Sequence, residues 1–95
     1  MSADRDELIT VLNEAKQLVH RQGNDFSWSS WDNRNEALAE LDAQIGMVKA
    51  GDLSKRLDLR VIFAVTGPLQ ELSLSSGWAH EFLVLAERFD RVQNA

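Results

Sequence analysis

Apolar positions recur every three or four residues along most of the chain, the spacing that gathers side chains on one side of an α-helix. This spacing predicts long helices over residues 3–22, 32–50 and 77–92. Gly23 and Gly51 follow the first two, and glycine often ends a helix because it adopts the left-handed conformation without strain. The last helix has the heaviest apolar stripe, which consists of Trp78, Phe82, Leu85, Phe89 and Val92. The pattern predicts an all-α bundle.

Residues that can cap a helix N-terminus precede each of the long helices. The expected caps are Ser2, a capping box of Ser29 with Asp32, and Ser75 or Ser76. The inner stripe of the second helix consists of Leu38, Leu41, Ile45 and Val48. Gly46 interrupts this helix at a cost of about 1 kcal/mol relative to alanine, which indicates either a close helix crossing or a weak point.

The middle of the chain fits two structures. Apolar residues alternate over 57–65, as in a strand that would form a β-hairpin with 69–75. Four apolar positions of the same stretch also share one helical face, namely Leu57, Val61, Ala64 and Val65. Because an isolated two-stranded hairpin is only marginally stable, short helices at about 53–65 and 68–74 are favoured, with the hairpin as the alternative. Pro68 suits the first turn of the second short helix.

The composition limits the class of protein. Ninety-five residues predict a single helical domain, 1–95. Because cysteine is absent, disulfides, thiolate metal sites and cysteine nucleophiles are excluded, and a reducing, cytoplasmic compartment is expected. The polar, acidic N-terminus is unlike a signal peptide. The longest apolar run covers only residues 61–65, against the roughly 20 that a membrane-spanning helix needs, so no membrane segment is expected.

The formal net charge of −5 argues against nucleic acid as a partner. Five acids and one base fall within residues 25–42. Asp32, Glu36 and Glu40 are spaced four residues apart, which stacks them along one helix face. Such a face is typical of a solvated exterior, and it is also a candidate contact for a basic protein partner. A carboxylate-bridged metal site is not expected, because the chain has no Glu-x-x-His pair of the kind that bundle di-metal sites use.

The search for catalytic chemistry finds no complete set of residues. The five glycines occur singly, which excludes a phosphate-binding glycine loop. His80 and Glu81 resemble the start of a zinc-protease helix motif, but Val84 stands where the second histidine should be. We therefore assign no catalytic residue, metal or cofactor and expect a protein that is not an enzyme.

Three tryptophans, Trp28, Trp31 and Trp78, are many for a chain of this length. One interpretation places them in the core, each indole N–H donating to a carbonyl or a water. The other makes them a dimer contact, or together with His80 a pocket for a small apolar ligand, since tryptophan is enriched at interface centres.

The last third of the chain carries a resemblance. Residues 66–78 read TGPLQELSLSSGW, and EFL at 81–83 and ERFD at 87–90 follow. This stretch resembles a group of small bacterial all-helical proteins of unknown function. The spacing G-x-L-x-E-L that begins at Gly67 is similar to one in short bacterial proteins grouped with toxin-immunity genes. The resemblance implies a compact bacterial domain and no catalytic residues. We expect Glu71 to accept hydrogen bonds from the backbone of the turn.

These observations favour a cytoplasmic, non-enzymatic protein-interaction module. It would act by self-association, giving a homo-oligomer, or through its acidic face. A small-ligand pocket is one alternative. An immunity-type inhibitor whose acidic surface blocks a basic toxin or nuclease is the other.

Overall fold

The structure is a computed structural model that describes residues 3–52, 56–64 and 67–94. Over these residues the chain forms α1 (Ala3–Val19), the short 3-10 helix η1 (Phe26–Trp28), α2 (Arg34–Ala50), α3 (Arg56–Ile62), α4 (Pro68–Ser76) and α5 (Ala79–Asn94). The all-α prediction is confirmed. The alternative hairpin is not supported, because its two strands would fall largely within α3 and α4. None of the described helices is long and apolar enough to cross a membrane.

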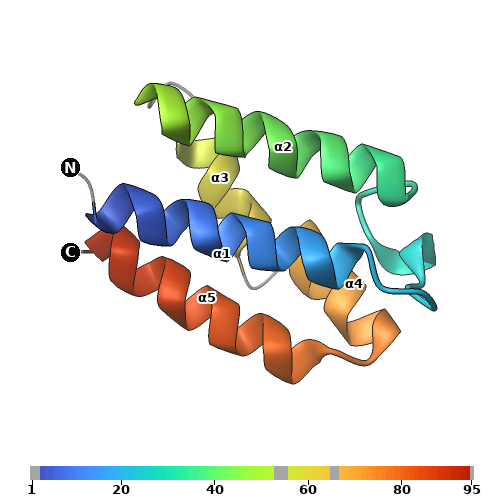
Figure 1. Ribbon diagram of the computed structural model, residues 1–95. Coiled ribbons are helices and arrows are strands. Elements are labelled where there is room, and N and C mark those ends of the chain that lie inside the picture. The colour runs from blue at the N-terminus through green and yellow to red at the C-terminus, as the bar shows by residue number, and fades with distance from the viewer. Residues whose placement is uncertain (1–2, 53–55, 65–66, 95) are drawn as a thin grey trace.

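The helices are arranged around α1, which lies between α2 and α5 and packs against both (Figure 1). α3 and α4 lie behind this row of three helices in Figure 1 and connect α2 to α5. α4 packs on α5 and on η1, and α3 packs on α4. This arrangement leaves the outer side of the α3 and α4 pair without a covering helix among the described residues.

The core confirms the apolar stripe predicted for the last helix. The four side chains Trp78, Phe82, Leu85 and Phe89 are 2–3% exposed. Phe63, just after α3, stacks on Phe89 with ring centroids 4.4 Å apart. Leu69 and Leu72 of α4 are fully buried. The core therefore joins α3 and α4 to α5.

α1 ends earlier than its apolar pattern predicts, at Val19 rather than at residue 22. The cause is Asn24, whose Nδ2 donates to the carbonyl oxygens of Leu18 (2.9 Å) and Val19 (2.8 Å). These bonds satisfy carbonyls that the next helical turn would otherwise use. Gly23 has a φ of +87°, so the predicted left-handed break is confirmed. The predicted cap Ser2 lies outside the described residues.

α2 begins after Asn33, and the predicted capping box of Ser29 with Asp32 is wrong. The Oδ1 atom of Asn33 accepts a hydrogen bond from the backbone N–H of Glu36 at 2.9 Å. Ser29 has another role, since its hydroxyl oxygen accepts from the backbone N–H of Trp31. Asparagine caps a helix about as well as serine, so the two sites compete and the cap adjacent to the helix is the one formed.

The buried face of α2 differs in part from the predicted stripe. Its buried residues are Ala37, Leu41, Gln44 and Ile45, whereas Leu38 and Val48 are partly buried. A Cβ built on Gly46 would meet nothing within 4 Å, so the predicted close crossing is wrong and this glycine is a weak point. Gly51 ends the helix with a φ of +73°, as predicted.

The junction of α3 and α4 depends on Gly67 and Pro68. A Cβ on Gly67 would overlap the carbonyl oxygen of Val61, so only glycine fits where the chain passes the end of α3. Pro68 occupies the first turn of α4, as predicted. α3 has seven residues, far fewer than the expected 53–65, and residues 53–55 and 65 lie outside the described part of the chain.

The predicted capping of the last helix by Ser75 or Ser76 is wrong. Gly77, with a φ of +88°, ends α4, and the carbonyl of Trp78 accepts the first helical bond of α5. The two serines instead hold the loop after α1. The Ser75 hydroxyl donates to the carbonyl oxygen of Asp25 at 2.7 Å. The Ser76 hydroxyl oxygen accepts from the backbone N–H of Asp25 at 2.9 Å.

Candidate functional site

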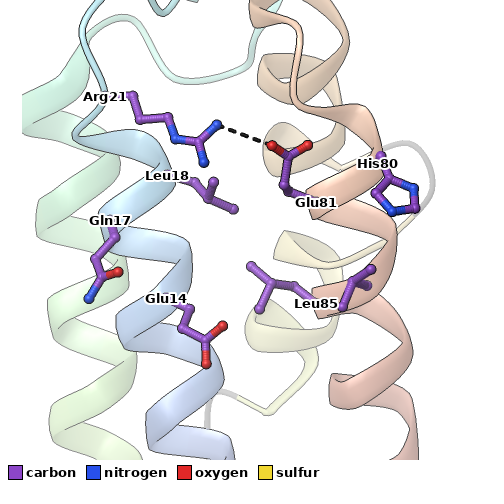
Figure 2. A pocket seen from close by; sticks show the side chains of 8 residues that line it. Glu14, Gln17, Leu18, Arg21, His80, Glu81 and Leu85 are labelled. Atoms are coloured by element: carbon purple, nitrogen blue, oxygen red, sulfur yellow. Dashed lines mark hydrogen bonds and ion pairs between the residues drawn. The ribbon is translucent and has the colours of Figure 1, made fainter.

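A groove of about 350 Å³ runs between α1 and α5. Its lining is formed by Glu14, Gln17, Leu18, Arg21, His80, Glu81, Val84 and Leu85 (Figure 2). Leu18 and Leu85 are almost fully buried and form an apolar floor, while the polar side chains stand at the rim. Its volume falls within the range of small-ligand sites, so it is one candidate site.

An ion pair closes one end of this groove. Arg21, just beyond α1, reaches across to Glu81 in the first turn of α5, with Nη1 and Oε2 3.3 Å apart (Figure 2). A hydrogen bond from its own backbone N–H lowers the pKa of Glu81, and Arg21 lowers it further. N–H groups in the first helical turn have no carbonyl partner, so they favour a carboxylate there.

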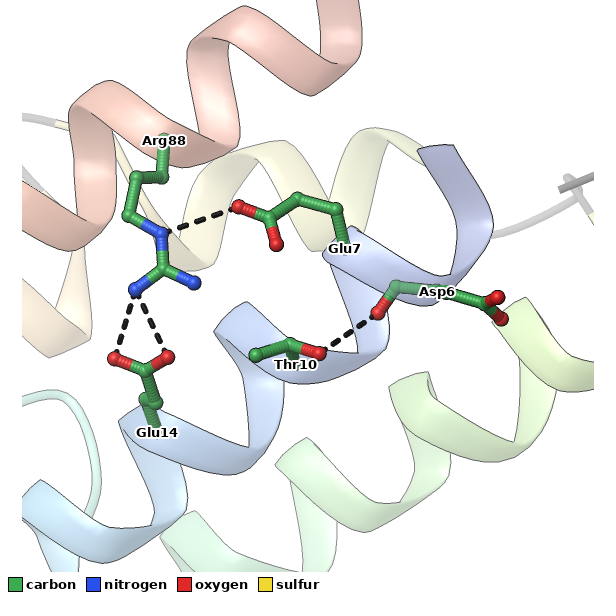
Figure 3. A network of polar contacts seen from close by, with 5 residues as sticks. All are labelled: Asp6, Glu7, Thr10, Glu14 and Arg88. Carbon is green, nitrogen blue, oxygen red and sulfur yellow. Dashed lines mark hydrogen bonds and ion pairs between the residues drawn. The ribbon is translucent and has the colours of Figure 1, made fainter. Parts of the chain in front are cut away.

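A second charge network joins α5 to α1 about two turns after Glu81. Arg88 lies between Glu7 and Glu14 of α1, with Nε 3.2 Å from Glu7 Oε2 and Nη1 2.8 Å from Glu14 Oε1 (Figure 3). Hydrogen bonds to Glu14 and then to Glu7 raise the pKa of Arg88 above its ordinary value. The groove therefore lies beside two sets of charged side chains that already pair within the protein.

A wider hollow of about 420 Å³ lies on the outer side of α1. It is lined by Asn13, Lys16, Gln17, His20 and Arg21. Lys16 forms an ion pair with Asp42 of α2, and Arg21 pairs with Glu81, so two of its cations are already engaged. No group of three or more His, Asp or Glu side chains that could hold a metal is found in the described parts of the chain.

Trp31 and Trp78 do not line either hollow. Trp31 and Trp78 are each 2% exposed and belong to the core. The Nε1 of Trp78 donates to Asn24 Oδ1 at 2.7 Å, which confirms the core interpretation for this residue. The Nε1 of Trp31 is buried and has no hydrogen-bond partner among the described residues. The side chain of Trp28 lies outside what the structure describes, and His80 lines the groove between α1 and α5.

The candidate acids form a smaller group than their spacing predicts. Asp32 precedes α2, so the predicted stack of three on one helix is wrong, and only Glu36 and Glu40 share a helical face. All three are exposed, and Glu36 Oε1 accepts from the backbone N–H of Asp32 at 3.3 Å. The nearby Asp42 is engaged with Lys16 on α1. The acidic stretch is therefore divided among a loop, a helix face and an interhelical ion pair.

Side-chain hydrogen bonds hold the loop after α1 against α4. Asp25 caps η1, and hydrogen bonds from Ser27 hold the pKa of Asp25 below its ordinary value. Glu71 Oε1 accepts from both the backbone N–H and the hydroxyl of Ser30, each at 2.9 Å. Glu71 was expected to bind its own turn, and it binds this more distant loop because η1 packs against α4.

The outer face of α3 is a third candidate site, which the sequence reading missed. Leu57 is 72% exposed and Val61 is 51% exposed, whereas Leu59, Ile62 and Phe63 are buried. Leu57 and Val61 lie one turn apart and so form one apolar strip. The exposed pair and the three buried residues all fall within residues 57–63. The sequence alone therefore does not show which of the two groups packs into the core.

No known family model matches the chain, and neither the curated proteins nor the solved structures contain a match. The resemblance of the last third of the chain to small bacterial proteins stays a prediction.

Proposed function

We propose that this chain is a non-enzymatic protein-interaction module that associates with a second copy of itself through the outer face of α3. The observation that carries the proposal is the exposure of Leu57 (72%) and Val61 (51%) on one side of that helix. Removing two such side chains from water against a matching strip is favourable, because apolar burial drives most protein association.

The charges beside the strip favour a second copy over a charged partner. Asp58 and Arg60 flank it, both are exposed, and neither forms an ion pair with another described residue. Asp58 on one side of the strip and Arg60 on the other give two identical copies a complementary pair of charges, as an interface between identical surfaces requires. A basic partner would gain little here, since the exposed Glu36 and Glu40 lie on α2.

The neighbouring helix α4 exposes a further leucine. Leu74 is 65% exposed on α4, which packs against α3. It lies on the side of α4 opposite the buried Leu69 and Leu72. The two side chains of the strip form, in each copy, a patch smaller than the roughly 800 Å² per partner of a standard interface. We therefore expect a weak, concentration-dependent dimer.

The groove between α1 and α5 is less favoured as the functional site. A ligand that used Arg21 would have to displace Glu81, and one that used Glu14 would compete with Arg88. Each of these exchanges gives up an existing charge contact, which offsets part of the gain from the new one. The outer face of α3 requires no such exchange.

Sedimentation equilibrium from micromolar to millimolar protein tests the proposal. The mean mass of the wild-type protein should rise with concentration toward twice that of one chain. Leu57→Gln combined with Val61→Gln should keep the mean mass near that of one chain, because it removes the apolar strip without touching the core. Circular dichroism checks that the variant retains its helical signal.

The matched control is Leu83→Gln, which changes another exposed leucine, 54% accessible, on α5. It should associate as the wild type does. A wild-type protein that stays monomeric at millimolar concentration would overturn the proposal. So would a folded Leu57→Gln, Val61→Gln variant that associates as strongly as the wild type.

A further inference from the structure

The order of residues on α3 also determines how two copies can meet, an inference that rests on the proposed self-association. At about 100° per residue, Asp58 lies about 100° to one side of Leu57 and Arg60 about 60° to the other. Val61 lies only about 40° from Leu57 around the helix axis. The apolar strip therefore runs along the helix, with Asp58 on one flank and Arg60 on the other.

Symmetry relates this arrangement to the direction of the paired helices. When the two-fold axis runs along the helices, they are parallel, and the flank that carries Asp58 faces the flank that carries Arg60 of the second copy. When the axis is perpendicular to them, they are antiparallel, and like flanks face each other. Coiled coils use the same rule to set orientation through their flanking charges.

We infer that two copies of this protein pair through α3 in parallel, with Asp58 of each copy facing Arg60 of the other. The two residues are two positions apart, a rise of about 3 Å, which side chains of this length can bridge. Two symmetric pairs then form, and the antiparallel alternative brings like charges together on both flanks. Leu57 of one copy lies beside Leu57 of the other, and the two Val61 side chains meet in the same way.

Cysteine cross-linking tests the direction directly, because the chain contains no cysteine of its own. Two cysteines form a disulfide when their Cα atoms are within about 7 Å. In the parallel pair, Leu57→Cys alone should cross-link to itself under mild oxidation, and so should Val61→Cys alone. In an equimolar mixture, the self-linked products should predominate. A mixture in which the mixed Leu57→Cys, Val61→Cys product predominates would overturn the parallel arrangement.

Charge variants give a second readout. In the parallel pair, Asp58→Arg or Arg60→Asp alone should weaken dimerisation by roughly two- to tenfold, because each places like charges opposite one another twice. An equimolar mixture of the two should recover the wild-type affinity, and added salt should reduce these differences. Single variants as strong as the wild type, with a mixture stronger than the wild type, would indicate antiparallel pairing and overturn the inference.

These outcomes are distinct from failure of the proposed function. If the wild type dimerises and the cross-links or the charge variants give the results expected for antiparallel pairing, only the inferred parallel direction of the two α3 helices is wrong. If the wild type does not dimerise in sedimentation, both proposals fall.

Discussion

At the scale of single residues, Asn24 makes more connections than its place in a loop suggests. Its side-chain N–H groups end α1 by donating to two carbonyls, and its oxygen accepts from the indole of Trp78. One partly buried amide therefore links the end of α1 to Trp78, the residue just before α5. A buried polar group that loses its partner costs more than the hydrogen bond contributes, so such a residue has a large effect on stability.

We expect Asn24→Ala to lower the free energy of unfolding by about 2–4 kcal/mol, because the Trp78 indole and the Val19 carbonyl lose the hydrogen bonds that Asn24 makes to them. Urea denaturation followed by circular dichroism measures this change. Asn35→Ala, which alters an exposed asparagine on α2, serves as the control and should change stability by less than about 0.5 kcal/mol. Equal effects of the two substitutions would contradict this role of Asn24.

At the scale of helices and turns, two glycines have opposite effects because their surroundings differ. Gly67 lies where the chain passes closely by the end of α3, and its missing Cβ leaves room for the Val61 carbonyl. Gly46 lies within α2 with open space around it. A methyl group therefore clashes at the first position and only improves helix propensity at the second.

Gly67→Ala is expected to lower the free energy of unfolding by about 1–3 kcal/mol, since α3 and α4 must separate to admit the new methyl group. Gly46→Ala should raise it by about 0.5–1 kcal/mol, because alanine restricts the unfolded chain and favours the helix. Parallel urea titrations of the two variants give both values. A stabilising Gly67→Ala would show that the two helices can move apart at no cost.

Periodicity predicted the helices well and their ends less well. The stripe of α5 and the left-handed Gly23 and Gly51 follow from local patterns, and the structure confirms them. The caps of α2 and α5 were wrong because serine, asparagine and aspartate all suit a cap, and tertiary contacts decide among them. The hydrogen bonds of Ser75 and Ser76 to the backbone of Asp25 could not be predicted, since Asp25 is about fifty residues away in sequence.

The candidate site was harder to predict than the fold for a related reason. α3 contains two apolar sets on opposite faces, and a pattern alone does not tell which one the core takes. The sequence left a core role and a surface role open for the tryptophans, and Trp31 and Trp78 are buried in the core. Local spacing determines which residues share a face, and only packing determines which face remains exposed.

At the scale of the whole molecule, two carboxylates with lowered pKa values lie at one end of the bundle. Asp25 caps η1, and its backbone is bound by Ser76, which leads into the start of α5. Glu81 lies in the first turn of that helix and pairs with Arg21 beyond the end of α1. The stability of this end of the bundle should therefore depend on pH in the range where the two carboxylates titrate.

A carboxylate whose pKa is lower in the folded state contributes stability that is present above its ordinary pKa and is lost as the pH falls through the folded value. The ordinary values are 3.8 for Asp25 and 4.5 for Glu81. We expect the melting temperature of Glu81→Gln to lie below that of the wild type above pH 4.5, with the gap closing as the pH falls further. Asp25→Asn should behave likewise around 3.8, and thermal melts across this range measure both. A gap that stays constant down to the lowest pH would show that these carboxylates act through packing rather than through charge.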